Sequence, residues 1–214
     1  IRKGCQGKGL GKITAGKNIV GQFFESAVLT AGKDVQATYL LNCQLKANGK
    51  LLVEGRKGVI IGGKTCAKLG VSCNGIGNIA EIATVVSVGI DKEDMTAYQE
   101  LQKKIEQTQA ELQTCENGLN KLMANPVHDE KVSMMIQRLT RAVYMLKSSR
   151  KELFSERNAQ MEQMTKQKEA RIQVSGRAYP GTLLFLNEDP FAIKEIYNNV
   201  EFVKHDNRID TLAH

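Results

Sequence analysis

The chain has 214 residues, 42% of them hydrophobic, which is enough to bury a core and excludes a disordered chain. Its net charge is +7, and residues 1–90 hold the excess, with twelve Lys or Arg against four acidic residues. No apolar run approaches the ~20 residues of a membrane span and no signal peptide opens the chain, so we expect a cytoplasmic protein. Because the sequence starts inside an apparent coil, we also expect a longer protein upstream.

The first twelve residues are rich in Gly and Lys and could be mistaken for a phosphate-binding loop. No helix signal follows Gly11, whereas a phosphate loop needs a helix N-terminus to present its N–H groups. This segment therefore predicts a turn-rich edge of the fold.

Residues 13–68 repeat themselves with a period of sixteen, and three apolar columns share this step. The columns are Ala15, Ala31 and Ala47, then Ile13, Leu29 and Leu45, then Ile19, Val35 and Leu51. Gly and Asn lie between the columns, where they adopt positive φ at little cost. Each unit therefore reads as a strand, a turn and a second strand.

A unit of this length has no room for a helix pair, which needs ~33 residues, and it cannot bury its apolar side alone. Copies of the unit must stack at the ~4.8 Å spacing of hydrogen-bonded strands. The repeat therefore predicts a mainly β protein, a parallel β-helix with small Ala and larger aliphatic side chains in interior columns.

The period lengthens after Leu51. The alanine equivalent to Ala47 in the next unit is Ala67, twenty residues on instead of sixteen, so four residues are inserted around Glu54–Gly58. Insertions in solenoids are accommodated in turns. We therefore expect an enlarged turn at this point and an unbroken interior.

Gly58–Thr65 matches the nucleotide-binding P-loop pattern, which ends here in Gly63, Lys64 and Thr65. The residues after Thr65 show no helical periodicity, and Val59–Ile61 favour a strand where the loop should lie. We expect a strand here, and a nucleotide-binding enzyme remains an alternative function. Residues 75–80 partly match the dinucleotide fingerprint and lack the βαβ context for it.

Residues 83–89 alternate as a last strand, and from Asp91 the apolar period becomes helical. Asn125-Pro126 separates two heptad seams, because Pro disfavours the helical conformation of the residue before it. The first seam contains Tyr98, Leu101, Ile105, Thr108, Leu112, Cys115, Leu119 and Leu122. The second contains Val132, Ile136, Leu139, Val143, Leu146, Arg150, Leu153, Arg157, Gln160 and Met164.

The short connector between the seams predicts a long antiparallel coiled-coil hairpin, an arm ~50 Å long that projects from the solenoid. Arg150 and Arg157 stand at seam positions, where they fix the register or extend their long stems to solvent. Strand patterns resume at Arg171. We expect this last segment to close the solenoid, with Phe185, Phe191 and Phe202 covering its end.

Three parts follow from these patterns: a parallel β-helix over residues 1–90, a coiled-coil insertion over 91–171, and a final coil and cap over 172–214. The five Cys include no CxxC pair, and no His has metal-ligand spacing, so we expect reduced thiols and no metal site. Cys43 and Cys66 are expected as small core residues. No catalytic or cofactor-binding residue is expected.

Candidate partner-binding residues come from two places, the basic solenoid and the hairpin tip. They are Lys12, Lys17 and Lys33, and Pro126, Val127 and His128. A basic face could attract nucleic acid, an anionic membrane or an acidic protein, or it could be a solvated surface that keeps strand edges unpaired. Few aromatic residues accompany the lysines to stack on bases, which disfavours nucleic acid.

Several segments together resemble the bacterial flagellar assembly protein A family. They are Ile13–Gly16, Val28–Val35, Val59–Ala67, Ile76-Gly77 and Ala83–Gly89, followed by the helical insertion and Tyr179–Gly181. The resemblance covers nearly the whole chain, although Thr65 is polar where the column favours an aliphatic residue. It implies a right-handed parallel β-helix in a cytoplasmic protein that takes part in flagellar assembly and placement.

The resemblance supplies no catalytic residue, and the architecture favours a non-enzymatic scaffold or regulator. The resemblance alone implies that this scaffold takes part in polar flagellum assembly. The expected partners are proteins of the flagellar or cell-pole machinery, with a homo-oligomer as a further option, because open coil ends and coiled coils both associate. The alternatives are a basic β-helix that binds nucleic acid or an anionic membrane, and the nucleotide-binding enzyme considered above.

Overall fold

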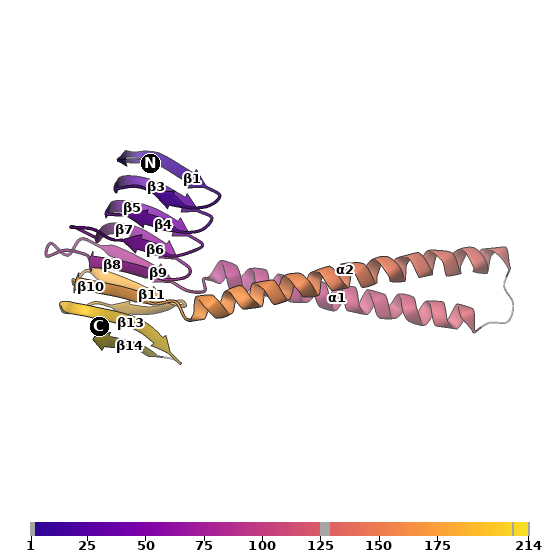
Figure 1. Cartoon of the computed structure of the whole chain (residues 1–214). Helices are drawn as coiled ribbons and strands as arrows, with labels where there is room; N and C mark the ends of the chain where they lie inside the picture. The colour runs from indigo at the N-terminus through magenta and orange to yellow at the C-terminus, as the bar shows by residue number, and fades with distance from the viewer. Residues whose placement is uncertain (1–2, 125–128, 207, 214) are drawn as a thin grey trace. The chain divides into compact units, whose positions relative to one another are not determined.

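The computed structural model describes residues 3–124, 129–206 and 208–213, and it divides into two compact units. One unit is a β-solenoid formed by Ile1–Lys92 and Met164–His214, and the other is the helical segment Glu93–Gln163. The fold prediction, a β-solenoid interrupted by a long two-helix insertion, is confirmed (Figure 1).

The solenoid is built from short strands on both sides of the insertion. Before it come β1 (Gly4–Ala15), β2 (Ile19–Val20), β3 (Phe23–Ala31), β4 (Val35–Ala37), β5 (Tyr39–Ala47), β6 (Leu51–Val53), β7 (Val59–Ala67), β8 (Val71–Ile76) and β9 (Thr84–Val88). After it come β10 (Ile172–Ala178), β11 (Thr182–Leu186), β12 (Asp189–Ala192), β13 (Tyr197–His205) and β14 (Arg208–Ala213).

Parallel pairing between successive coils reproduces the sixteen-residue repeat. β1, β3, β5 and β7 stack in this order along one side (Figure 1), and β2, β4, β6, β8 and β10 stack along another. Ala15 pairs with Ala31, Ala31 with Ala47, and Ala47 with Ala67, so the alanine column is confirmed. The column then continues through Val88.

The interior consists of these columns. Val35 pairs with Ile19 on one side and Leu51 on the other, and its side chain is fully buried. Thr65 is also buried, in the column between Leu45 and Val86. Each aliphatic side chain that leaves water here contributes about 1.5–3 kcal/mol of favourable transfer free energy.

The four inserted residues lie in the turn between β6 and β7, where the sequence repeat lengthens. Ala37 to Tyr39 is a one-residue connection, whereas the next coil crosses the same corner through Glu54–Gly58. Tyr39 nevertheless pairs with Val59, so the following strand returns to register. The additional residues therefore enlarge one turn and leave the interior columns continuous.

A second set of side chains links the turns. The Asp34 N–H donates to Asn18 Oδ1 at 3.3 Å, and the Lys50 N–H donates to Asp34 Oδ1 at 2.8 Å. These positions are sixteen residues apart, so each turn caps a backbone donor of the next coil with a side-chain oxygen. These bonds satisfy backbone N–H groups at the turns, which the strand ladders leave without a partner.

The helical unit contains α1 (Lys92–Met123) and α2 (Glu130–Lys168), which pack together antiparallel (Figure 1). Arg150 Nη1 donates to Gln109 Oε1 at 2.8 Å, and Lys147 Nζ lies 2.8 Å from Glu116 Oε1. Every residue of the two predicted seams is buried or half-buried, so both seams are confirmed. Asp129 caps α2, because its Oδ1 accepts the Val132 N–H at 2.8 Å.

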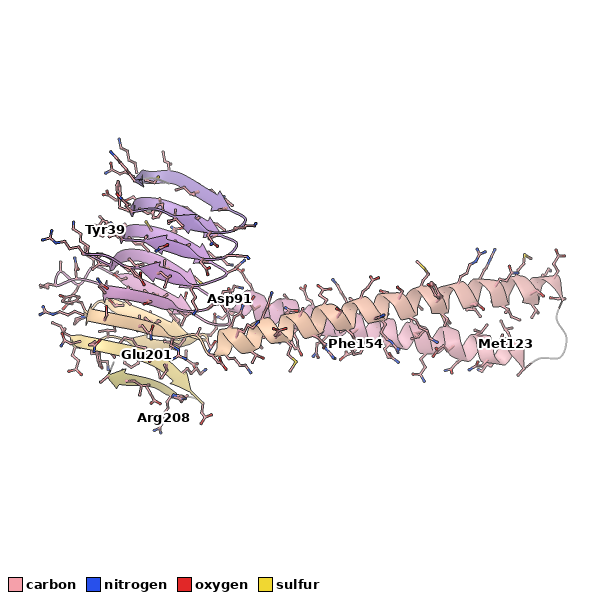
Figure 2. The ribbon with its side chains drawn as sticks, in the orientation of Figure 1. Tyr39, Asp91, Met123, Phe154, Glu201 and Arg208 are labelled. Atoms are coloured by element: carbon pink, nitrogen blue, oxygen red, sulfur yellow. The ribbon has the colours of Figure 1, made fainter. Side chains whose placement is uncertain are left out.

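The two seam arginines behave differently. The hydrogen bond from Arg150 to Gln109 crosses between the helices, which supports the role in fixing register. Arg157 instead lies over the ring of Phe154, with 4.6 Å between the guanidinium carbon and the ring centroid. Figure 2 labels Phe154 on α2.

The last segment closes the solenoid. β13 pairs antiparallel with both β10 and β14, and Phe191, Tyr197 and Phe202 form an aromatic cluster with centroid distances of 5.5–6.3 Å. The expectation for Phe185 was wrong. β11 turns Leu184 and Leu186 into the interior, so the alternation of a strand leaves Phe185 half-buried on the other side.

Two other expectations are corrected. Residues 4–15 form a regular strand rather than a turn-rich edge, and only the bulge between Gln6 and Gly11 is irregular. Cys66 is half-buried because the alternation of β7 turns it away from the interior, which Thr65 and Ala67 occupy instead. Cys43 and Cys73 are the buried thiols.

We predict that Val35→Asp prevents soluble expression, because it buries an unpaired carboxylate in the middle of a fully buried column. Gln36→Asp, at the exposed neighbouring position, is the matched control and should express normally. Yield, monodispersity and the far-UV circular dichroism spectrum are the measurements. A folded Val35→Asp protein would contradict the stacked interior.

Candidate functional site

Two of the predicted basic residues occupy the same turn on successive coils. The Lys33 N–H donates to the Lys17 carbonyl at 3.1 Å, and the Gly49 N–H donates to the Lys33 carbonyl at 3.0 Å. Stacked coils hold such positions ~4.8 Å apart. Both lysine side chains are exposed. Lys12 is also exposed but lies within β1, opposite Val28, so the structure groups Lys17 with Lys33 and leaves Lys12 on a neighbouring strand.

The charge of this corner is moderated by Asp34, which follows Lys33 directly and whose carboxylate accepts the Lys50 N–H. Within the part of the chain that the structure describes, the ammonium groups of Lys17 and Lys33 make no salt bridge. Two unpaired ammonium groups at fixed spacing can hold a carboxylate or phosphate of a partner, although solvent weakens such a contact. The assignment of these lysines to partner binding stays a prediction.

Pro126, Val127 and His128 lie outside the described residues. Next to them the structure places Met123, whose side chain is 59% exposed, and Asp129, which caps α2. The role of the tip in binding is likewise a prediction.

The P-loop pattern lies on a strand, as expected. Gly63 pairs with Cys43 in β5 and with Thr84 in β9, and the Gly62 N–H donates to Thr84 Oγ1 at 2.9 Å. These N–H groups therefore face neighbouring coils, whereas a P-loop turns them toward phosphate oxygens. β7 continues past Thr65 to Ala67, and the residues that follow form a turn and β8, not a helix.

The glycines of this pattern have a structural role at a corner. Gly62 has φ 69° and Gly63 has φ 77°. A Cβ on Gly62 would collide with Oδ1 of Asn42, which occupies the equivalent position of the previous coil and has φ 49°. The column of left-handed residues thus turns the chain at the same place in each coil.

The buried thiols are held in their neutral form. Burial raises the pKa of Cys73 from 9.0 to about 12, and burial is also the main reason that the pKa of Cys43 is raised. A thiol must ionise to act as a nucleophile or metal ligand. In residues 3–124, 129–206 and 208–213, no three His, Cys, Asp or Glu side chains are grouped as a metal site requires.

Sequence reasoning missed an ionic cluster where the solenoid chain leads into α1. Asp91, labelled in Figure 2, has its Oδ2 3.7 Å from Lys68 Nζ and 4.0 Å from Lys46 Nζ. Lys68 is 8% exposed, so this ion pair is shielded from solvent. The signal that could have revealed it is an Asp directly before a helix, together with two lysines near the ends of neighbouring repeat units.

The return from α2 is fixed by Asn187. Its Oδ1 accepts the Ile90 N–H at 2.9 Å, and its Nδ2 donates to the Lys168 carbonyl at 3.2 Å. One side chain therefore joins the chain segments that precede α1 and end α2, both within the solenoid unit. Neither helix, over its described residues, is long and apolar enough to cross a membrane.

Comparison with models of known protein families identifies the family of this chain. A family model described as the Flagellar Assembly Protein A beta solenoid domain matches residues 1–209. The chain belongs to this family. Comparison with the curated proteins and with the solved structures gave no match.

The Flagellar Assembly Protein A match extends over the solenoid and its helical insertion alike. The resemblance inferred from the repeat segments and from the position of the insertion is therefore confirmed. The matched domain is named for its solenoid, and the observed stacking of β1 to β10 agrees with that description.

We predict that Gly62→Ala lowers the free energy of unfolding by about 1–3 kcal/mol, because Ala is strained at this φ and collides with Asn42. Lys64→Ala, at an exposed position of the same pattern, should change it by less than ~0.5 kcal/mol. Denaturant titration measures both. Titration with a fluorescent ATP analogue should show no saturable binding; binding that Lys64→Ala abolishes would restore the P-loop hypothesis.

Alkaline pH should destabilise the solenoid through Cys73. Above its ordinary pKa of 9.0 and up to about 12, the unfolded chain has lost a proton that the folded chain keeps, so the free energy of unfolding falls as pH rises. Cys73→Ala should show a shallower fall than the unchanged protein. Iodoacetamide labelling followed by mass spectrometry should modify Cys73 only after unfolding, and modification in the folded protein would contradict its burial.

Proposed function

We propose that the chain is a non-enzymatic scaffold or regulatory protein in bacterial flagellum assembly, which binds protein partners through its solenoid face and its coiled-coil hairpin. The observation that carries this proposal is the family match over residues 1–209, since the family is described by its part in flagellar assembly. The proposed domain plan is a solenoid over residues 1–90, a helical insertion over 91–171 and a final coil and cap over 172–214. The two ends of this insertion, up to Lys92 and from Met164 onward, belong to the compact solenoid unit.

The geometry supports a role in binding proteins. A solenoid presents exposed side chains at a constant spacing on a rigid surface, as Lys17 and Lys33 illustrate. The helices add an antiparallel pair of 32 and 39 residues, with one apolar stripe used for mutual packing and the remaining surface available to partners. We place the protein in the cytoplasm, with recruitment to the cell pole, and we take its partners from the flagellar or cell-pole machinery.

The structure allows a clean test of the hairpin. Glu93–Gln163 forms a unit of its own, while Asp91 and the buried Gln167 and Ala170 belong to the solenoid. A variant in which only Glu93–Gln163 is replaced by a Gly-Ser linker of about 8 residues, with an r.m.s. reach of roughly 16 Å, keeps these anchors. It should retain the β-type circular dichroism spectrum and a cooperative thermal transition.

In a deletion strain of the native bacterium, we expect the full chain to restore flagella and the linker variant to fail, with loss of the partner that crosslinks to the full chain. Lys17→Glu with Lys33→Glu tests the solenoid corner in the same strain. A deletion strain with normal flagella would remove the flagellar role. A linker variant that restores flagella fully would leave the solenoid face as the binding surface.

A further inference from the structure

The exposed surface of α2 carries large apolar side chains that the seam does not use. Met134 is 49% exposed, Met145 is 67% exposed and Tyr144 is 74% exposed. They fall within the first half of α2, where Ile136, Leu139 and Val143 supply the contact with α1. These residues are therefore apolar without contributing to the hairpin's own packing.

Met134, Arg138, Arg141 and Met145 follow one another at steps of four, three and four, so they share one side of the helix, opposite the seam. We call this surface the Met–Arg face. At 1.5 Å per residue it extends for ~17 Å, about three turns. Tyr144 lies at its margin.

The charge of this part of α2 has a single sign. From Lys131 to Lys151 there is no Asp or Glu, whereas Arg138 and Arg141 stand in the middle of the segment. Both arginines are exposed, and among the described residues neither has a salt bridge. Acidic residues return at Glu152, just beyond the Met–Arg face.

Helix α1 provides an internal comparison, because it has a similar seam and a similar exposed surface. The side opposite its seam is polar and of mixed charge, with Gln99, Lys103, Glu106, Thr114 and Lys121. Its exposed large apolar residues, Met95 and Met123, lie near its two ends. The combination of Met, Tyr and Arg is thus particular to α2 and does not follow from coiled-coil packing.

We propose that the Met–Arg face binds an acidic amphipathic helix of a partner protein. This inference rests on the proposed function as a protein-binding scaffold and names the surface and the chemistry of the partner. Met, Tyr and Arg are the residues enriched in the centres of protein interfaces, and Met adapts its shape to helices laid against it. The arginines would pair with Glu or Asp that flank an apolar stripe on the partner.

Two other occupants fit the surface less well. A second copy bound through the same face would set Arg138 and Arg141 against their own equivalents, and like charges repel. An anionic membrane requires a broad apolar face that sinks into the lipid, and two Met with one Tyr at the margin offer little apolar area. An acidic helix satisfies both the charge and the size of the surface.

The test uses the full chain and two stapled helical peptides of about 18 residues with the same Leu stripe, one flanked by Glu and the other by Lys. Fluorescence anisotropy measures binding. We expect saturable binding of the Glu peptide, weakening with added salt, and at least tenfold weaker binding of the Lys peptide. Arg138→Glu with Arg141→Glu should reduce affinity for the Glu peptide about tenfold or more and increase affinity for the Lys peptide.

Matched controls are available on α1. Lys103→Glu with Lys104→Glu makes the same change in net charge at exposed positions, and should leave Glu-peptide affinity within about twofold. Met134→Ser with Met145→Ser should weaken binding, whereas Met95→Ser with Met123→Ser should not. All substituted positions are exposed, so circular dichroism should show unchanged helicity.

Equal binding of both peptides, or equal effects of the α1 and α2 charge reversals, would overturn the proposal. So would binding to phosphatidylglycerol vesicles, or a dimer in light scattering, that depends on Arg138 and Arg141 while the Glu peptide does not bind. These outcomes would contradict the binding of an acidic helix only. The proposed scaffold function would still be supported if the linker variant fails to restore flagella. Failure of the function itself would appear as normal flagella in the deletion strain.

Discussion

The structure depends on the register between successive coils. Each strand is hydrogen-bonded to its equivalents above and below, so a residue's position in the repeat decides whether its side chain points into the interior. A shift by one residue would turn every column outward. Val35, Thr65 and Leu184 are buried for this reason, although they differ in polarity and belong to three different coils, with Thr65 and Leu184 in one column and Val35 in another. The turn bonds from Asn18 to Asp34 and onward to Lys50 hold the same register from outside the core.

Because register is restored at every strand, the turns tolerate insertions. The five residues Glu54–Gly58 replace a one-residue connection without moving the columns. The helical insertion is the extreme case, since Val71 in β8 pairs directly with Ile172 in β10 across the whole hairpin. The junction is secured by local contacts, Asp91 with Lys68 on entry and Asn187 with the Lys168 carbonyl on return. An addition of this size costs the solenoid little, because loop-closure entropy grows slowly with length.

The sequence predicted the repeat, the site of the first insertion and both seams, since each of these depends on periodicity alone. It did not predict side chains whose position depends on local alternation or on contacts distant in sequence. Phe185 was expected to cover the end of the solenoid and Cys66 to fill the core, and the alternation of a strand turns each of them away from the interior. Tyr197 was not expected in the aromatic cluster, because β13 runs antiparallel and breaks the repeat that located the other columns. The Asp91 cluster brings together Lys46, Lys68 and Asp91 from three successive coils, which no single repeat unit contains.

The two units use their polar and apolar residues differently, and this difference bears on function. In the solenoid, aliphatic side chains fill the inward positions of the repeat, and Lys, Gln and Thr are common at the outward positions, where they keep strand edges soluble. The exposed apolar residues of this unit, such as Val20, Ile79 and Ile196, are spread over different strands and turns. In α2, Met134 and Met145 remain on the surface after the seam has been filled, beside arginines without acidic neighbours. Exposed apolar groups weaken solubility and bring no gain to folding, so their concentration on α2 is the observation on which the proposed binding of a partner helix rests. The solenoid keeps its coils in register, and α2 carries the exposed Met and Arg side chains that the packing of the two helices does not use.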